Sequence, residues 1–349
     1  MTNKQYTSLE RTLTAIGQQE PDRVPLFLLL TMHGARELGM SIGEYFSNPM
    51  NVATGQLRMR TKYKNDCIYS LYYAPIEIEA WGGEVIFYDD GPPNSGEPFI
   101  KSVEQINRLE APRVSDSPQL LKVLETIKMI YQQVGGEVPI IGVVMSPFSL
   151  PVMQMGFEKY LEVLYYHPEL FNKLMLINES FCLDWANAQI EAGATAICYF
   201  DPLASPTIIE RNTYLKTGFQ VAKRVIPAIK GPTATHMASG IVIPVLDELV
   251  ETGTLIAGVS ANEHLSDIKT AANKRLTLLG NMNGLEMINW KPGDATKCIK
   301  DIIRNGARGG GLIISDNHGE IPWHVSEETL LEISAAVAEW GRYPLDWIG

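Results

Sequence analysis

The hydrophobic positions of the chain fall into two alternating patterns. Runs of five to eight apolar, β-prone residues are separated by longer segments in which apolar residues recur with helical spacing. Several runs, such as VPLFLLL and VPIIGVVM, are apolar at nearly every position, which is typical of parallel strands covered on both faces. The pattern predicts eight strands, at residues 24–30, 67–73, 138–145, 195–201, 232–236, 254–260, 275–280 and 311–315.

Eight strands that alternate with helices predict an α/β protein of the (β/α)8 TIM-barrel type. The segment 168–193 is the clearest helix, because it starts at a proline, ends at a glycine and aligns an apolar stripe of Phe171, Leu174, Ile177, Phe181 and Trp185. Residues 75–98 alternate and then break at Gly-Pro-Pro, which indicates an inserted hairpin. The sequence has no internal repeat or low-complexity linker. We therefore expect a single barrel domain over residues 1–349, with a helical N-terminal extension and this insertion.

Composition and charge narrow the class of protein. The chain is 45% hydrophobic and 20% charged, which is typical of a globular protein with a large core. A net charge of −11, without a long basic cluster, argues against nucleic acid as a partner. Cys67, Cys182, Cys198 and Cys298 form no CxxC pair, and no apolar stretch is long enough to span a membrane. With no signal-like N-terminus either, we expect a cytoplasmic protein.

The carboxyl ends of barrel strands are where chemistry is expected, because the βα loops converge on that face. In this sequence those loops contain four of the six histidines and two carboxylates, namely His33, His236, His264, His318, Asp201 and Glu263. Two imidazoles and one carboxylate form a normal ligand set for catalytic zinc, with a fourth position open. The sequence therefore predicts a metal site of His236, Glu263 and His318, with a metal-free, hydrogen-bonded pocket as the alternative.

Other polar residues on these loops have simpler interpretations. His264 is expected to point away if Glu263 points inward, and His167 and His324 are expected in surface or loop positions. Helix capping is as good an explanation as ligand binding for Ser146, Asn262, Asn281 and Asn283, each taken singly. Three alternating carboxylates are expected to form a solvated strand face, at Glu77, Glu79 and Glu84.

Motifs along nearly the whole chain resemble the uroporphyrinogen decarboxylase superfamily, and more closely its cobamide-dependent methyltransferase branch. The residues that carry this resemblance are PDRVP at 21–25, GGEV at 82–85, SPFSL at 146–150, AGATAI at 192–197, DPLASP at 201–206, His236, GNMNG at 280–284, GGGLIIS at 309–315 and Ile321-Pro322. The decarboxylase itself keeps arginines near its N-terminus for many substrate carboxylates. Only Arg36 is at hand here, so a porphyrinogen substrate is considered unlikely, because its carboxylates would be left unpaired.

The methyltransferase branch includes methylcobamide:coenzyme M methyltransferases, which hold zinc through a His-x-Cys pair after the fifth strand and a cysteine after the eighth. A glutamate after the sixth strand can complete that shell. This chain resembles the pattern at His236 and Glu263, but Ala238 stands at the first cysteine position and His318 lies near the second. A site without thiolates favours a hard oxygen ligand over a thiol, which puts coenzyme M as the methyl acceptor in doubt.

The resemblance therefore implies a corrinoid-dependent O-demethylase methyltransferase, which takes a methyl group from a methoxylated aromatic and gives it to the cobalt of a corrinoid-binding partner protein. Zinc would activate the ether oxygen, and the barrel would align the reacting atoms. Asp201, Tyr199 and His33 are the candidate catalytic residues. The substrate pocket is expected to be built from Met145, Phe148, Met237, Asn281 and Asn283.

Two further hypotheses stay open. One is a methyltransferase from methylcobalamin to a thiol of the coenzyme M kind or to a pterin. The other is a non-catalytic barrel that binds a corrinoid or tetrapyrrole. In each case the partners are a small molecule and a corrinoid species, without nucleic acid or membrane, and the sequence leaves a homodimer open.

Overall fold

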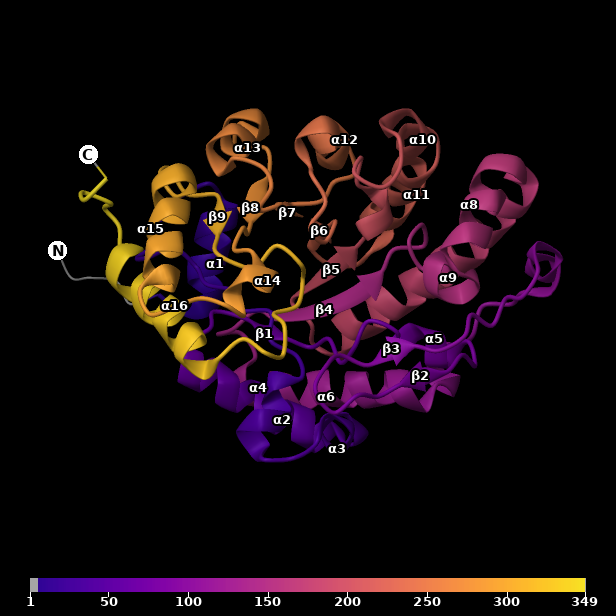
Figure 1. Cartoon of the computed structure of the whole chain (residues 1–349), viewed down its shortest axis with the longest axis horizontal. Coiled ribbons are helices and arrows are strands. Elements are labelled where there is room, and N and C mark those ends of the chain that lie inside the picture. The colour runs from indigo at the N-terminus through magenta and orange to yellow at the C-terminus, as the bar shows by residue number, and fades with distance from the viewer. Residues whose placement is uncertain (1–5, 349) are drawn as a thin grey trace.

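Seven parallel strands form one continuous curved sheet in the computed structural model, which describes residues 6–348. In the sheet they follow the order of the chain (Figure 1), and they are β1 (Ile68–Tyr69), β4 (Ile140–Met145), β5 (Ala196–Phe200), β6 (Thr233–His236), β7 (Ile256–Gly258), β8 (Thr277–Leu279) and β9 (Leu312–Ile313). Each lies inside a predicted strand. The shared register, for example Val143 opposite Cys198 and Phe200 opposite His236, places the carboxyl ends of neighbouring strands side by side.

The first predicted strand, residues 24–30, closes the barrel without forming a regular ladder. Leu26 makes a single parallel bridge to Ile314, and the amides of Phe27 and Ile314 bond to the carbonyls of Ile314 and Pro25 at 2.8 and 2.9 Å. This segment is therefore the eighth member of the (β/α)8 barrel, lying between β9 and β1.

Side chains complete the closure on the β1 side. The Asn65 amide accepts from the Leu28 N–H at 2.8 Å and donates to the Leu28 carbonyl at 2.9 Å, as a neighbouring strand would. The Asp66 carboxylate accepts from the Leu26 N–H at 2.9 Å, and the Asp66 N–H donates to the Leu26 carbonyl at 2.8 Å. Two consecutive side chains thus supply three of these four hydrogen bonds, and one backbone bond supplies the fourth.

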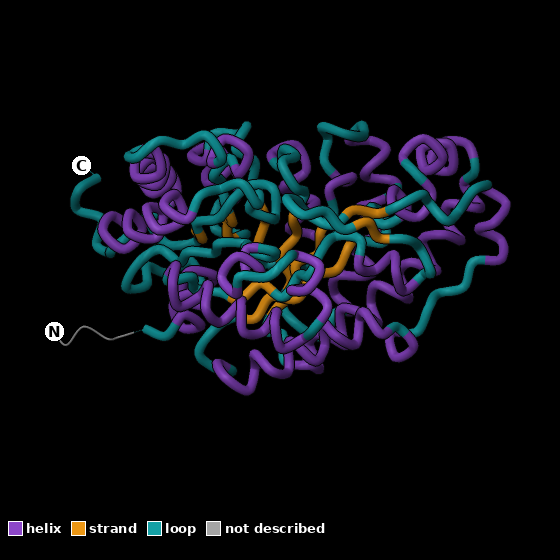
Figure 2. The backbone as a smooth tube through the Cα atoms, turned by 60° about the horizontal axis from the view of Figure 1, so that its bottom comes forward, coloured by secondary structure: helices purple, strands orange, loops and turns teal. Residues whose placement is uncertain are grey.

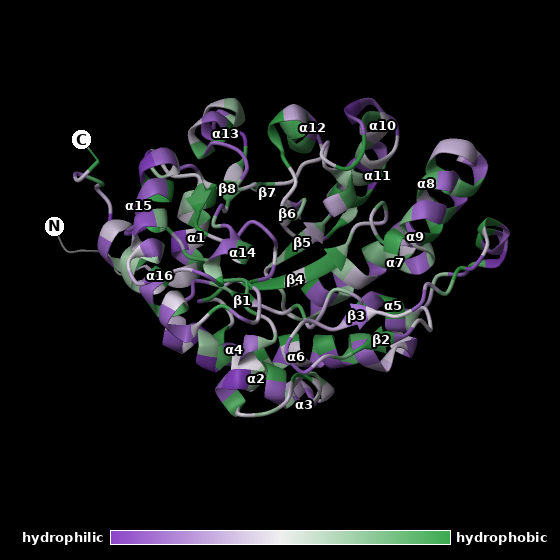
Figure 3. Cartoon of the chain, viewed as in Figure 1, coloured by the Kyte–Doolittle hydropathy of each residue, from purple (hydrophilic) through white to green (hydrophobic). Residues whose placement is uncertain are grey.

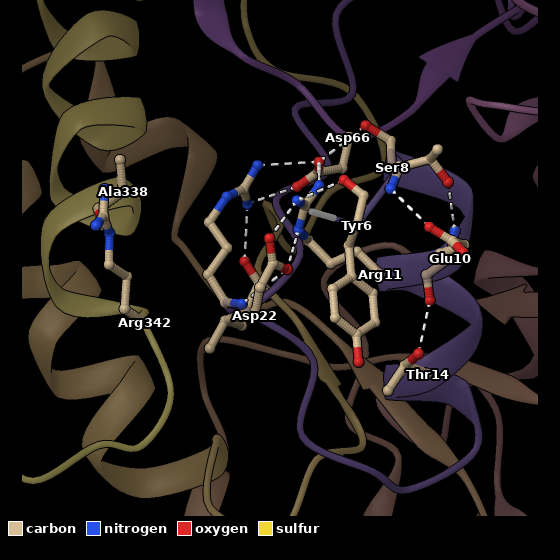
Figure 4. Close-up of polar contacts among 12 residues, drawn as sticks. Tyr6, Ser8, Glu10, Arg11, Thr14, Asp22, Asp66, Ala338 and Arg342 are labelled. Carbon is tan, nitrogen blue, oxygen red and sulfur yellow. Dashed lines mark hydrogen bonds and ion pairs between the residues drawn. The ribbon is translucent and has the colours of Figure 1, made fainter. Parts of the chain in front are cut away.

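Asp66 is itself held by an ionic cluster beneath the barrel (Figure 4). Its buried carboxylate accepts from Arg11 Nη1 at 2.8 Å, Arg23 Nη1 at 2.6 Å and the Ser8 hydroxyl at 3.1 Å. Arg11 also forms an ion pair with Asp22 at 2.7 Å. Because two guanidinium groups and several hydrogen bonds compensate this buried charge, the cluster ties the N-terminal helix to the seam.

Helices cover the outside of the sheet (Figures 1 and 2). The α-helices before the fifth strand are α1 (Ser8–Ile16), α2 (His33–Leu38), α3 (Ile42–Ser47), α4 (Pro49–Tyr63), α5 (Ile76–Ala80), α6 (Pro118–Val134), α7 (Pro151–Met155), α8 (Phe157–Tyr166) and α9 (Pro168–Ala192). They are followed by α10 (Arg211–Lys216), α11 (Gly218–Val225), α12 (Leu246–Glu251), α13 (Leu265–Ala272), α14 (Gly284–Met287), α15 (Asp294–Gly306) and α16 (Glu327–Trp340). Short 3-10 turns are η1 (Val103–Arg108), η2 (Val114–Asp116), η3 (Pro202–Ala204), η4 (Ile226–Ala228) and η5 (Ile243–Val245).

The predicted helix 168–193 is confirmed as α9, which ends at Gly193 in the left-handed conformation. Four residues of its predicted stripe are buried, whereas Ile177 is only half-buried and Asn178 takes a buried position beside it. The predicted hairpin is also present, as the antiparallel pair β2 (Val85–Ile86) and β3 (Asn94–Ser95), after helix α5. Among the described residues, no helix has both the length and the apolar character needed to cross a membrane.

Alternation along the strands separates two hydrophobic regions. Figure 3 shows the hydrophobic character of strands such as β4 in green. On β5, Ile197 and Tyr199 face the helices, whereas Cys198 faces the barrel interior. The interior is a small apolar cluster made of Phe27, Leu29, Cys67, Tyr69, Ile141, Val143, Cys198, Ala234, Ile256, Leu279 and Ile313. The larger core lies between sheet and helices.

The seam makes a direct prediction for stability. Replacing Asn65 with leucine (Asn65→Leu) leaves the buried Leu28 N–H and carbonyl without partners, which should lower the free energy of unfolding by roughly 2–5 kcal/mol. Urea denaturation followed by circular dichroism measures this. The control is Asn305→Leu on the exposed face of α15, which should change stability by less than about 0.5 kcal/mol. Equal effects of the two substitutions would show that Asn65 does not close the barrel.

Candidate functional site

A cavity of about 100 Å³ lies at the carboxyl ends of β1, β4 and β5, beneath the loop that follows β9. Its lining combines aromatic and apolar side chains with ionisable groups, namely Tyr69, Leu71, Ala74, Ile76, Glu77, Val143, Met145, Phe200, His318, Gly319 and Glu320. Of the described residues, no Lys or Arg contributes to this lining. The cavity occupies the face of the barrel on which chemistry was predicted.

His236 and His318 lie next to one another at this rim. The His236 ring is fully buried at the end of β6, with its centroid 5.6 Å from the Phe200 ring that lines the cavity. Its Nδ1 accepts from the Ala238 N–H at 3.1 Å, whereas Nε2 is buried without a partner. Burial, and secondly the neighbouring His318, lower the pKa of His236 to about 4. Burial also lowers the pKa of His318, whose Nδ1 is unpaired. Both imidazoles are therefore neutral at pH 7.

Glu263 does not join these two imidazoles as predicted. Its carboxylate accepts from the N–H groups of Val242 and Ile243, at 2.8 and 2.9 Å, and so caps the turn η5. A carboxylate that accepts two backbone N–H groups at a helical N-terminus has its stabilising partners already. His264, beside it, is exposed.

The residues present do not fit the three-ligand zinc site. The bare Nε2 of His236 and Nδ1 of His318 are suitable ligand atoms, but the third predicted ligand is engaged in the cap. Across residues 6–348, no three side chains of the His, Cys, Asp or Glu type are placed to hold an ion together. In this structure His236, Glu263 and His318 are therefore not arranged as a metal shell, because a backbone cap holds the glutamate.

Asp201 is buried after β5 and held by two hydroxyl groups. Its Oδ1 accepts from Ser146 Oγ and Ser149 Oγ, each at 2.6 Å. Burial raises the pKa of Asp201 to about 6, although the serine hydrogen bonds lower it. Ser146 also caps the turn that begins the next segment, through the Ser149 N–H at 2.9 Å. Asp201 thus fixes the loop after β4 to the loop after β5, close to the rim but outside the cavity lining.

Three predicted site residues belong to the core between sheet and helices instead. Tyr199 faces outward from β5, because side chains alternate along a strand and its neighbours Cys198 and Phe200 face inward. Phe148 packs against the rings of Tyr160 and Phe171, and Met237 is fully buried in the same core. Among the predicted apolar wall residues, only Met145 lines the cavity.

The remaining candidates lie outside the cavity lining. Asn283 caps α14 by accepting from the Leu285 and Glu286 amides, and Asn281 donates to the Ser260 carbonyl at 3.0 Å. His33 is buried at the start of α2, 5.7 Å from the Trp323 ring between centroids, and it does not line the cavity. Capping, the simpler interpretation, applies to Asn283, whereas Asn281 bonds to the loop after β7 and caps no described helix.

Asp316 shapes the loop that carries His318. Its Oδ2 accepts from the His318 and Gly319 N–H groups at 2.8 and 2.9 Å, and its Oδ1 is buried and unpaired. Burial raises the pKa of Asp316 to about 6. The carboxylate therefore positions the backbone of His318 rather than its imidazole.

Two cavity carboxyls were missed from the sequence. Glu77 was expected on a solvated face but is 3% exposed, on helix α5. Glu320 accepts a hydrogen bond from Thr31, and burial raises its pKa to about 7. The alternation of Glu77 and Glu79 suggested a strand, whereas the residues form a short helix that turns Glu77 toward β4. A glutamate between two isoleucines was the one available signal of its burial.

The cap predicts how Glu263 behaves in a metal assay. Glu263→Gln should weaken two charge-assisted hydrogen bonds and lower the free energy of unfolding by about 1 kcal/mol, while zinc content stays equal to that of the unchanged protein. Denaturation and elemental analysis of purified protein measure both. The exposed Glu110→Gln serves as control. Loss of bound zinc in Glu263→Gln, but not in Glu110→Gln, would show that Glu263 is a zinc ligand.

His33 predicts a pH dependence of stability. Burial, and secondly Arg36, lower its pKa to about 3 in the folded protein. The unfolded chain binds this proton near pH 6.5, so stability from His33 is intact above that pH and is lost as the pH falls toward 3. Between pH 7 and 5 the unchanged protein should lose about 2 kcal/mol more than His33→Asn. His264→Asn, at an exposed position, should show no such difference in urea titrations at the two pH values.

Comparisons with known proteins agree with this architecture. The family model described as uroporphyrinogen decarboxylase (URO-D) matches residues 7–340. Methylcobamide:CoM methyltransferase MtaA of Methanosarcina barkeri is 25% identical over 336 residues, covering 91% of this chain and 94% of its own. Uroporphyrinogen decarboxylase of Idiomarina loihiensis is 22% identical, covering 90% and 91%. A solved methyltransferase from Methanosarcina mazei superposes with a TM-score of 0.85 at 22% identity, covering 96% of this chain and 99% of its own.

Proposed function

Because the chain belongs to the uroporphyrinogen decarboxylase family, we propose that it is a corrinoid-dependent methyltransferase, which moves a methyl group between a small molecule and the cobalt of a corrinoid-binding partner protein. Relatives named as methylcobamide:CoM methyltransferases, similar over about nine tenths of the chain, support the reaction class. The cavity at the carboxyl ends of the strands supplies a place for the small molecule.

The charge of the cavity is the observation that favours a particular substrate. Glu77 and Glu320 line it, and among the described residues no cationic side chain does. A sulfonate of the coenzyme M kind or the carboxylates of a porphyrinogen would be buried there without compensation. A neutral methyl ether meets no such penalty. The favoured reaction is therefore O-demethylation, in which a methoxylated aromatic gives its methyl group to the corrinoid.

The size of the cavity limits how such a donor would bind. At about 100 Å³ it is smaller than the roughly 150 Å³ engineered cavity known to hold benzene. The methoxy group would lie inside, against Met145 and Phe200, while the ring would extend toward the exposed Ala74. In this arrangement the protein contributes alignment and exclusion of water. The partner's corrinoid, in its cobalt(I) state, is the substrate that accepts the methyl group.

The proposal predicts methylcobalamin formation. Purified protein, incubated with cobalt(I) cobalamin or a reduced corrinoid protein and a panel of methoxylated aromatics, should form the methylated corrinoid, followed by absorbance. Methylcobalamin with coenzyme M should react poorly in the reverse assay. Rapid turnover with coenzyme M and none with ethers would favour the thiol methyltransferase instead. Corrinoid binding without any methyl transfer would favour the non-catalytic barrel.

Blocking the mouth tests the location of the site. Ala74→Trp should raise the KM for the ether at least tenfold, because the indole would occupy the path of the aromatic ring. Ala335→Trp, on the exposed surface of α16, should leave kinetics unchanged. Equal kinetics of the two variants would place the donor elsewhere.

A further inference from the structure

Glu77 differs from the other carboxyl group of the cavity, Glu320, because one of its carboxyl oxygens holds the backbone and the other has no hydrogen-bond partner. The side chain extends from the first turn of α5 to the end of β4, where Oε1 accepts from the Met145 N–H at 2.8 Å. This bond satisfies a backbone group that β1 is too short to reach. Oε2 is buried and has no hydrogen bond of normal geometry. Oε1 therefore has a structural role, whereas Oε2 is free to bond to a molecule in the cavity.

The surroundings of Glu77 favour its neutral form. Burial, the largest cause, raises the pKa of Glu77 to about 8, although the Met145 N–H and the nearby Trp185 act in the opposite direction. The other ionisable groups that line the same cavity are Tyr69, His318 and Glu320. None of them supplies a positive charge at pH 7, since the pKa of His318 is itself lowered by burial.

We propose that Glu77 is the proton donor to the leaving oxygen of a methyl ether bound in the cavity. This step rests on the proposed function. The bond between the methyl carbon and the ether oxygen breaks, and its electron pair stays on the oxygen. Cobalt(I) of the partner's corrinoid gives two electrons to a new bond with the methyl carbon and becomes cobalt(III). The Glu77 proton moves to the oxygen, so that a phenol departs and Glu77 is left as a carboxylate, to be reprotonated from solvent.

The chemistry of the leaving group explains why such a donor is needed. A phenol ionises near pH 10, so a phenolate is a poor leaving group, and the predicted three-ligand metal site that would have stabilised it is not assembled among the described residues. A carboxylic acid kept neutral at pH 7 by an apolar site can act as donor in its place. A general acid whose pKa lies near the working pH typically contributes about 100-fold to 10,000-fold in rate.

The test compares Glu77→Gln with Glu79→Gln across donors of different leaving-group quality. In Glu77→Gln the new amide oxygen would still accept from the Met145 N–H, but the side chain cannot transfer a proton. Glu79, on the same short helix, bonds to the Tyr73 hydroxyl and lies outside the cavity lining, so it is the matched control. The donors are the methyl ethers of phenol and of a nitrophenol, together with methyl iodide, whose leaving group needs no proton.

Three results are expected. Glu77→Gln should lose at least 100-fold in kcat with the phenol ether, less with the nitrophenol ether and little with methyl iodide, whereas Glu79→Gln keeps all three rates. In the unchanged protein, the rate with the phenol ether should fall as the pH rises through about 8, because the donor loses its proton. That alkaline decline should be absent with methyl iodide.

Other outcomes overturn the inference. An equal loss with all three donors would mean that Glu77 is structural only, and an unchanged rate and pH profile would remove it from the reaction. If Glu77→Gln fails to fold, the pH profiles of the unchanged protein test the inference without it. The same pH profile for the phenol ether and for methyl iodide would contradict a role of Glu77 as proton donor. An unchanged protein that methylates a corrinoid from no donor would overturn the proposed function and this step with it.

Discussion

The hydrogen bonds from Asn65 and Asp66 to the backbone of residues 26–28 hold the barrel closed, and the candidate site depends on that closure. Residues 24–30 pair with β9 through backbone hydrogen bonds. Toward β1, most of the pairing comes from side chains instead. Thr31 lies at the end of this segment and bonds to Glu320 in the cavity wall. A barrel open at this seam would therefore lose the relative positions of Thr31, Glu320 and the loop that carries His318.

Burial of the ionisable groups at the carboxyl ends of the strands determines the chemistry available there. Four buried carboxyls near the rim have raised pKa values, and burial is the first cause in each case, at Glu77, Asp201, Asp316 and Glu320. His236 and His318 are shifted the opposite way for the same reason. The rim thus holds carboxyls with raised pKa values, of which Glu77 at about 8 is the one that is mainly protonated at pH 7, and imidazoles that are neutral there. Such a site is suited to neutral substrates and to proton transfer, and it is poorly suited to anions.

The sequence was a good guide to the strands and a weaker guide to the site. Near-continuous apolar runs and Gly-bounded helices report burial directly, so β4 and α9 lie where the pattern predicted them. Which rim side chains converge is a different question, because it depends on backbone groups that need partners. Glu263 was a reasonable ligand by position, but the free amides of Val242 and Ile243 take its carboxylate. Tyr199 was one residue out of phase with the inward face. The burial of Glu77 follows from an orphaned amide on β4, which no pattern of residue types records.

The seam between residues 24–30 and β9 also has a consequence for synthesis of the chain. Leu26 and Ile314, which form the closing bridge, are about 290 residues apart in sequence. At synthesis rates of about 5–20 residues per second, the ribosome takes roughly 15–60 seconds to make the partner of the first segment. During that interval the run PLFLLL has no β9 to pair with, and the partners already made are the side chains of Gln56, Asn65 and Asp66, which bond to Leu30, Leu28 and Leu26. Pairing of residues 24–30 with β9 is therefore the last closing contact of the sheet that synthesis permits.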